Sequence, residues 1–451
     1  MDSRDLGPDD ALLNQIFPDQ PHVSIDSIFV QTWDKCVFKA SFPHARQSDT
    51  SRPDISKPDA RKPPPSYLIR LEVVAKNEES TQFATVSAMQ QIASLAIPKL
   101  IPKTYRTGMT NNAQRKLVQF SVTKYIKGKT LEDVWEQMSD ENQQSVMAAL
   151  VEALQKLHSL RIPDSLDRIR DILAKCELPL APGGLREHIL GETDFMGGPS
   201  TGFFAPKDGP ALLSAIDKRW ELSGRPFYAK VATESGGVVV QSEYSDLGFV
   251  KVEKGCWEEW YREAVLCHND LNPRNIIVSS LSDSESTSAY QSDSSNETSD
   301  YELSAIIDWE LSGFYPPSYE LSLQDTYLSG ANRLFSFYSL LKSQMKDIVP
   351  RCPSQISLLQ VIDLIFESIQ RRLREGNNIP AIIRERFIQR LQLRRDEDPY
   401  LGWVPKDHEA ARLVLSFADV LNIERDVVAE REARREAKAA SRLQVGTGSD
   451  S

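Results

Sequence analysis

The sequence contains few cysteines and no excess of positive charge. Its five cysteines are an odd number in 451 residues, and none of them forms a Cys-x-x-Cys pair. A disulfide framework is therefore not indicated, and a reducing, cytoplasmic location is expected. The formal net charge of −11 argues against nucleic acid or an anionic membrane surface as a partner, because both repel an acidic chain.

Long apolar runs and histidine clusters are also absent from the sequence. No run of about 18 apolar residues occurs, so no membrane-spanning segment is expected. The N-terminal sequence has no apolar stretch of signal length, and the six histidines are scattered. What remains is a globular composition, 40% apolar and 26% charged, in a chain long enough for two or three structural units.

The first part of the chain favours strands. Apolar alternation and short apolar runs predict strands within 23–42, at 67–74 and at 117–126, and helical spacing predicts a helix at 80–95. Residues 43–65 are rich in Pro, Ser, Asp and Lys, which is typical of a long mobile loop. This part is therefore predicted to be a small, strand-rich lobe.

The rest of the chain favours helices. Helical periodicity is strong at 141–160 and returns at 328–395, whereas residues 161–262 show a mixed pattern. Residues 279–301 are almost all Ser, Asp, Glu and Thr, so this insertion is expected to be disordered. The predicted divisions are an N-terminal segment at 1–22, an N-lobe at 23–126, a helical C-lobe at 127–423 and a charged tail at 424–451.

One stretch, residues 265–278, carries most of the chemical information. It reads Val-Leu-Cys-His-Asn-Asp-Leu-Asn-Pro-Arg-Asn-Ile-Ile-Val, and the next apolar run ends in Ile-Ile-Asp-Trp-Glu. If the two runs form an antiparallel hairpin, Asn275 and Asp308 meet at the same end, opposite the acidic insertion. Asp270 lies on the loop that enters this end, so three oxygen-bearing side chains are predicted to converge.

Such a group of side chains suits phosphoryl transfer. Carboxylate and amide oxygens are ligands for Mg²⁺, which completes its shell with water and phosphate. One Asp can orient the attacking hydroxyl and accept its proton, while a second Asp and an Asn hold metal on the nucleotide phosphates. The alternative is a polar turn between two buried strands with its carboxylates in water, and the full spacing favours the catalytic interpretation.

These motifs resemble a known family. Residues 268–275 and 308–310 look like the catalytic loop and the metal-binding motif of the aminoglycoside phosphotransferase family, which shares the protein-kinase fold. The resemblance spans roughly 23–330 and is specific at 265–320. It implies an α+β, bilobal, protein-kinase-like fold with a small antiparallel-sheet N-lobe and a larger helical C-lobe. The resemblance also extends to 125–131, 154–160 and 313–320.

The resemblance also implies roles for the residues of the motif. Asp270 matches the catalytic base, and Asn275 and Asp308 match the metal ligands. His268 is expected to support the loop. The implied cofactors are ATP and Mg²⁺.

For the nucleotide, the resemblance points to two places in the N-lobe. Arg70 stands where the family has a third-strand lysine that pairs nucleotide phosphates; arginine binds phosphate well and is common in a fungal-looking branch of the family. The alternative for Arg70 is a surface charge on an edge strand. The hinge is expected near Thr123 and Tyr125, whose backbone groups would face the adenine.

The chain departs from the family pattern in two places. The turn Gln31–Cys36 contains no glycine, although kinase-like folds usually place glycines there for close approach to phosphate. The helix after the third strand has Thr85 at the expected Glu position, with Glu78 or Glu79 as substitutes. Arg70 is therefore expected to lack its carboxylate partner.

A small acceptor is favoured over a peptide. Protein kinases carry Lys where this chain has Asn272, and Asp-Phe-Gly where it has Asp-Trp-Glu. The segment from Asp308 to Glu320 spans only twelve residues, too few for a peptide platform. The predicted function is ATP-dependent transfer of the γ-phosphate to a hydroxyl of a small molecule, and the acidic balance favours a cationic acceptor such as an amino alcohol or aminoglycoside. The alternative, motivated by the two departures, is a non-catalytic pseudokinase-like binding or scaffold protein.

Overall fold

The computed structural model describes most of the chain. The described residues are 5–18, 23–42, 66–74, 83–176, 185, 187, 195–204, 209–220, 228–234, 236–280 and 301–446. The predicted mobile loop at 43–65 lies outside them, as do Glu78, Glu79 and residues 281–300 of the predicted insertion. The first and last residues of that insertion are described, and they belong to two strands.

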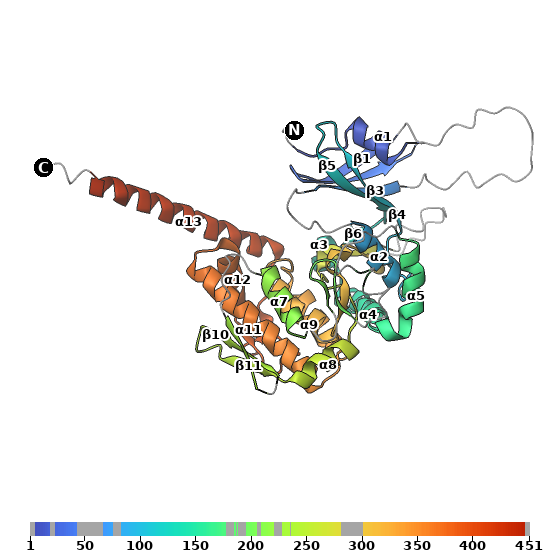
Figure 1. The fold of residues 1–451 in the computed structure, drawn as a ribbon. Helices are drawn as coiled ribbons and strands as arrows, with labels where there is room; N and C mark the ends of the chain where they lie inside the picture. Colours follow the sequence, from blue (N-terminus) through green and yellow to red (C-terminus); the bar gives the residue numbers. More distant parts are fainter. Residues whose placement is uncertain are drawn as a thin grey trace, which may run out of the picture.

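A five-stranded antiparallel sheet forms the N-lobe (Figure 1). Its order is β1-β2-β3-β5-β4, so the strand that carries Arg70 is central and the edge-strand alternative for this residue is wrong. Along β2 the residues Cys36, Phe38 and Ala40 are buried in alternation, because one face of the sheet covers a core. The strands are β1 (Ser24–Gln31), β2 (Lys35–Ser41), β3 (Ser66–Val73), β4 (Thr104–Asn111) and β5 (Leu117–Lys124).

Helix α1 (Asp10–Ile16) packs into the core of this lobe. Its N-terminus is capped by Asp9, whose Oδ1 accepts the Leu12 N–H at 2.8 Å. Leu12 and Ile16 are buried in the same apolar cluster as Phe38 of the sheet. The described part of the predicted N-terminal segment thus completes the N-lobe.

Helix α2 (Phe83–Ala93) connects the two lobes. It follows β3 in the chain, but Ala88, Met89 and Ile92 are buried in the main core of the C-lobe. Its N-terminal residue Phe83 lies instead against Arg70, with the guanidinium carbon 5.2 Å from the ring centroid. The helix is therefore packed on the C-lobe, and it contacts the sheet at Phe83 and at Gln90, whose Oε1 accepts the Thr104 hydroxyl of β4 at 2.7 Å.

Strand β12 (Val265–Cys267) passes between two of the apolar cores of the C-lobe. Leu266 belongs to the first core, together with Leu154 and other residues of the long helix predicted at 141–160. Val265 and Cys267 belong to the second core. The segment that follows β12 thus begins between two buried clusters, which fix its position.

The helices of this lobe and the tail are α3 (Leu131–Val134), α4 (Asp140–Leu157), α5 (Ile162–Ala174), α7 (Gly209–Trp220), α8 (Lys254–Arg262), α9 (Pro317–Tyr327), α10 (Phe335–Met345), α11 (Pro353–Glu375), α12 (Ile379–Arg390) and α13 (Phe417–Gly446). The 3₁₀ turns are η1 (Trp135–Gln137), η2 (Pro273–Asn275), η4 (Trp309–Leu311) and η5 (Ala410–Arg412). The remaining strands are β6 (Lys129–Thr130), β7 (Met196–Gly198), β8 (Gly202–Phe204), β9 (Tyr228–Ala232), β10 (Val238–Ser242), β11 (Phe249–Val252), β13 (Ile276–Ser280), β14 (Tyr301–Ile306), β15 (Gly313–Tyr315), β16 (Leu393–Arg395) and β17 (Trp403–Pro405).

Strands β13 and β14 form the antiparallel hairpin predicted from the two apolar runs. Ile276 pairs with Ile306 at one end and Ser280 pairs with Tyr301 at the other. The end that joins the hairpin to η2 and η4 is therefore the end where the polar motif residues emerge.

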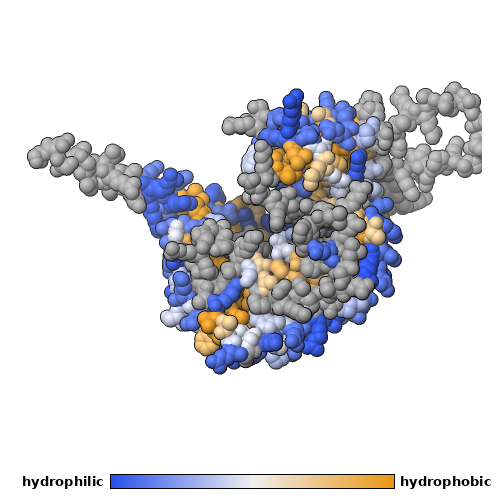
Figure 2. All heavy atoms as spheres, in the orientation of Figure 1, coloured by the Kyte–Doolittle hydropathy of each residue, from blue (hydrophilic) through white to orange (hydrophobic). Residues whose placement is uncertain are grey.

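The fold class predicted from the sequence is confirmed: the chain is α+β and bilobal, with the sheet lobe above the helical lobe in Figure 1. Residues 424–446 of the predicted charged tail belong to α13, which projects away from the body in Figure 1, and the part of this helix that is coloured in Figure 2 is mostly hydrophilic. Among the described residues, no helix is both long and apolar enough to cross a membrane.

Candidate active site

The loop between β12 and β13 buries most of its polar side chains, with the exception of Arg274. Asp270 is 6% exposed, and Asn272 is 0% exposed. The Asn272 amide Nδ2 donates to Asp270 Oδ1 at 2.5 Å, and the Asn275 Nδ2 donates to Asp270 Oδ2 at 2.7 Å. Two amide groups thus hold the Asp270 carboxylate in one orientation.

The same contacts orient Asn275. Its Nδ2 also donates to the backbone carbonyl of Asp270 at 2.9 Å, so the nitrogen faces the loop. The side-chain oxygen of Asn275 is then the atom that remains for a cation, as a metal ligand requires.

Asp308 follows the hairpin at the level of Asn275. The Ile307 N–H donates to the Asn275 carbonyl at 2.9 Å, and the backbone turns at Asp308 with a positive φ of 62°. Asp tolerates this left-handed conformation better than most residues. The structure thus brings Asn275 and Asp308 to the same end of the hairpin, as the sequence predicts, with Asp270 bonded to Asn275.

His268 connects the loop to the strand end that precedes Asp308. Its Nε2–H donates to the Ile307 carbonyl at 2.9 Å, and its Nδ1 accepts the Asp270 N–H at 3.2 Å. These two contacts fix one neutral tautomer, and the Trp309 ring packs edge-on against the imidazole at 4.6 Å. The predicted support role of His268 matches this geometry.

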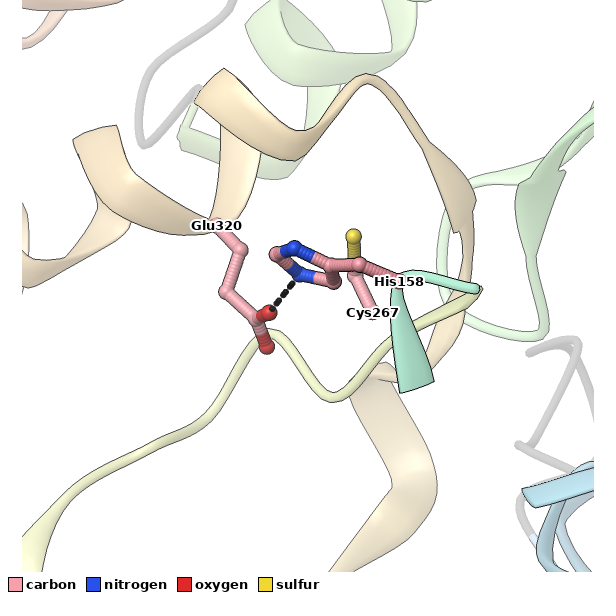
Figure 3. Close-up of side chains that lie close together, drawn as sticks. All are labelled: His158, Cys267 and Glu320. Carbon is pink, nitrogen blue, oxygen red and sulfur yellow. Dashed lines mark hydrogen bonds and ion pairs between the residues drawn. The ribbon is translucent and has the colours of Figure 1, made fainter. Parts of the chain in front are cut away.

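Behind the loop lies a buried carboxylate that the motif did not predict. Glu320, from α9, is 0% exposed, and its Oε1 accepts the N–H groups of His268 and Asn269 at 2.7 and 2.8 Å. Its Oε2 lies 3.0 Å from His158 Nε2 at the end of α4 (Figure 3). Glu320 therefore joins α4, α9 and the loop.

The charge of Glu320 is stabilised where it lies. Burial acts to raise the pKa of Glu320, but the hydrogen bond and charge of His158 and the Asn269 N–H outweigh burial and lower it. Cys267 lies beside this pair in Figure 3, and burial, helped by the Glu320 charge, raises the pKa of its thiol.

His158, Cys267 and Glu320 could in principle ligate a metal, since their ligand atoms lie within 4.8 Å of one another. Both oxygens of Glu320 are already engaged by N–H groups, and burial keeps the thiol protonated. The cluster is better explained as a structural contact that holds the loop in place.

Arg70 is surrounded by carboxylates, so the expectation that it lacks a partner is wrong. Its guanidinium contacts Glu72 at 2.8 Å, Asp308 at 3.2 Å and Glu310 at 2.6 Å. Burial opposes charge on Arg70, but Glu310, Glu72 and Asp308 outweigh it and raise the pKa of the guanidinium. The residues that replace the missing helix carboxylate come from the neighbouring position on β3 and from the Asp-Trp-Glu motif.

Helix α2 contains no acidic residue, and Phe83, not Thr85, lies against Arg70. A pattern search for a carboxylate in this helix therefore could not find the partner. The remaining signal was Glu310, two residues after Asp308 in the sequence.

A cleft of about 570 Å³ separates the sheet from the hairpin end. Five of the six predicted site residues line it, whereas Asp270 does not and lies behind Asn275. The lining residues are Phe29, Val30, Lys35, Val37, Leu68, Arg70, Phe83, Val86, Ser87, Gln90, Pro102, Thr104, Thr107, Ser121, Thr123, Lys124, Tyr125, Ile126, Gly128, Lys129, Thr130, Asp133, Asn275, Ile277, Ile307, Asp308, Trp309 and Glu310.

At the hinge, the backbone groups expected to be free are partly engaged. Thr123 pairs with Leu68 on one side of β5 and with Thr104 on the other. The Tyr125 N–H donates to the Ser66 carbonyl at 3.1 Å. The next N–H, that of Ile126, forms no hydrogen bond with the part of the chain that the structure describes.

A family model matches part of the chain. Residues 66–287 match the model of the phosphotransferase enzyme family. No curated protein matches the sequence.

Several solved structures are similar at low identity. A thermostable mutant of aminoglycoside phosphotransferase APH(4)-Ia, in ternary complex with ADP and hygromycin B, is 11% identical over 84% of this chain and 96% of that chain, with a TM-score of 0.39. A mutant of aminoglycoside 2'-phosphotransferase-IIIa in complex with GDP is 12% identical, over 93% and 95% of the two chains, with a TM-score of 0.35. The AMP-bound spectinomycin phosphotransferase APH(9)-Ia is 11% identical, over 84% and 90%, with a TM-score of 0.31. The ligands are those of the other proteins.

Proposed function

We propose that the chain is a phosphotransferase that moves the γ-phosphate of ATP to a hydroxyl of a small molecule. The observation that carries the proposal is the buried contact between Asp270 and Asn275 beside Asp308, at the edge of a cleft of about 570 Å³. A polar turn in water would leave these side chains exposed and free to rotate, whereas Asp270 is 6% exposed and doubly bonded.

In this proposal Asp270 orients the acceptor hydroxyl and takes its proton. The amides of Asn272 and Asn275 hold the carboxylate in place, so no reorganisation is needed when the hydroxyl attacks. In-line attack then forms a bond between the acceptor oxygen and the γ-phosphorus, while the bond from this phosphorus to the bridging oxygen of the β-phosphate breaks and ADP leaves.

Mg²⁺ is the metal that the site would hold. The free side-chain oxygen of Asn275 and the carboxylate of Asp308 are hard oxygen donors on one hairpin end, which fits this ion. When bound, Mg²⁺ offsets charge on the nucleotide phosphates.

The nucleotide would lie along the cleft. Val37 of β2, Leu68 of β3 and Ile277 of β13 give it apolar walls, which suit an adenine ring. The Ile126 N–H lies at the hinge beside Thr123 and Tyr125 and is the donor proposed for the base. Arg70 would bind the phosphates.

The short segment after Asp308 supports a small acceptor. It forms η4 and β15 and then enters α9 at Pro317, so no long segment is present to support a peptide. The glycine-free β1–β2 turn still favours a second candidate, a pseudokinase-like binding protein without turnover.

A thermal unfolding measurement with ATP and Mg²⁺ separates the two candidates in combination with a turnover assay. ATP with Mg²⁺ is expected to raise the midpoint, because a ligand that binds the native state stabilises it. Asp270→Ala should lower turnover about a thousandfold while the ligand-induced shift remains, because Asp270 does not line the cleft.

The acceptor for this assay comes from a panel of hydroxylated amines and sugars, scored by ADP release above the acceptor-free rate. A rise in the thermal midpoint with ATP, without turnover on any acceptor, would support the hypothesis of a binding protein without catalytic activity. Turnover that persists in Asp270→Ala would contradict the assignment of the base.

A further inference from the structure

The β1–β2 turn lacks the means by which a glycine-rich loop holds phosphate. Its residues are Thr32, Trp33, Asp34 and Lys35. The Thr32 N–H donates to the Lys35 carbonyl at 2.8 Å, and the Lys35 N–H donates to Thr32 Oγ1 at 3.1 Å. Two of the four amides are thus engaged within the turn, and side chains occupy the space that glycines would leave open.

A cation lies where this turn ends. Lys35 is the first residue of β2 and pairs across the sheet with Glu72, while Val37 pairs with Arg70. Residues two apart on a strand share a face, and so do directly opposed residues of an antiparallel pair. Lys35 therefore shares the cleft face with Arg70, and both line the cleft.

Glu72 lies between the two cations. Its Oε1 is 3.6 Å from Lys35 Nζ and accepts from Arg70 Nε at 2.8 Å. One carboxylate thus holds both positive groups side by side. The Lys35 side chain remains 35% exposed, so it is free to exchange part of this contact for a ligand.

The register of the sheet sets the distance between the hinge and Lys35, and this distance decides which part of a bound nucleotide could reach Lys35. At the hinge, Tyr67 of β3 pairs with Ala40 and with Lys124. Lys35 is five residues from Ala40 along β2, or roughly 17 Å. A nucleotide with its base at the hinge passes Arg70 first and brings only its terminal phosphates to Lys35.

We propose that Lys35 and Arg70 form a two-cation phosphate site that replaces the glycine-rich loop, with Lys35 bound to the terminal phosphates of a nucleoside triphosphate. This proposal rests on the proposed function, since it assumes that the base lies at the hinge. A lysine ammonium binds phosphate as a compact charge and needs no backbone approach.

Calorimetric titration of the full chain with ATP plus Mg²⁺, and separately with adenosine, tests the site. Lys35→Met should weaken ATP binding about tenfold, the effect of losing one charge-assisted hydrogen bond. Adenosine carries no phosphate, so its affinity should stay within about twofold. Lys35→Arg should keep most of the ATP affinity.

The matched control is Lys116→Met. Lys116 is exposed in the β4–β5 turn of the same lobe, and it does not line the cleft, so the variant loses the same charge elsewhere. Thermal unfolding of each variant without ligand confirms that it is folded, and Lys35→Gln replaces Lys35→Met if the latter is not.

Each outcome decides one point. Equal ATP affinity in Lys35→Met and the wild type overturns the Lys35 site while the nucleotide cleft stands. Equal losses for ATP and adenosine also overturn it, because the residue would then act on the base or the fold. A wild-type chain that binds neither ligand overturns the proposed function, and this inference with it.

Discussion

The catalytic loop and the nucleotide cleft fix their charged groups with partners at very different distances along the chain. Asp270 is bonded to residues two and five positions away, within one buried loop. Arg70 is bonded to Asp308 and Glu310 across 238 and 240 positions, at an interface between lobes that is partly open to solvent. The loop is thus fixed by local contacts and burial, whereas the cleft depends on how two lobes meet.

Asp308 is where the two regions touch, so its replacement should have the largest effect. Asp308→Ala removes a proposed metal ligand and one partner of Arg70 together. Turnover is expected to fall about a thousandfold. The part of the ATP-induced rise in thermal midpoint that needs Mg²⁺ should disappear.

Asp167→Ala, on the exposed surface of α5, is a control that removes one carboxylate away from Arg70 and from the cleft. A Mg²⁺-dependent shift that survives in Asp308→Ala would show that the metal is held elsewhere.

Replacement of Glu320 tests whether the catalytic loop depends on the buried hydrogen bonds that this side chain accepts. Glu320→Gln replaces a buried charge that accepts two backbone N–H groups and pairs with His158. We expect the free energy of unfolding to fall by about 3 kcal/mol, measured by chemical denaturation, and turnover to fall with it. His158→Gln leaves both loop contacts in place and should cost less.

The pH dependence of the free energy of unfolding shows how much of the Glu320 contribution comes from its charge and how much from its packing. Because its pKa is lowered below the ordinary 4.5, its charge stabilises the folded state above pH 4.5, and this stabilisation is lost as the pH falls through the lower folded pKa. The difference in the free energy of unfolding between the wild type and Glu320→Gln should therefore become smaller below pH 4.5. If this difference does not change with pH, the stabilisation comes from the packing and hydrogen bonds of the side chain and not from its charge.

Of the three replacements, that of Glu310 is expected to have the smallest effect on the protein, because the contact of Glu310 with Arg70 is partly exposed to solvent. Glu310→Gln should raise KM for ATP about fivefold with kcat little changed, since Arg70 loses one anchor but keeps Glu72 and Asp308. Steady-state kinetics at fixed acceptor measure both constants. A lower KM would instead identify Glu310 as a competitor of phosphate for Arg70.

The contrast between the two regions also explains what the sequence could predict. The hairpin end, with Asn275 beside Asp308, follows from strand periodicity and the spacing of one motif, because its contacts are local. The fold class follows from the change from strand to helix patterns. Strand β4 was not predicted, because its exposed, Thr-rich sequence shows no apolar alternation.

Long-range partners could not be predicted in the same way. The sequence shows that α2 has no carboxylate, but only the packed lobes show that Glu310 reaches Arg70 instead. Likewise, Glu320 gives no periodic signal, and its role depends on three elements that meet behind the loop. A missing motif residue therefore does not imply a missing interaction.

The placement of α2 has a mechanical consequence. With Met89 and Ile92 buried in the C-lobe core, this helix belongs to the helical lobe, and it meets the sheet where Phe83 lies against Arg70 and where Gln90 accepts the Thr104 hydroxyl. Any separation of the two lobes would therefore move the sheet relative to a helix that stays with the C-lobe. The contacts that such a separation would break include the ring contact of Phe83 with Arg70 and the ion pairs of Arg70 with Asp308 and Glu310.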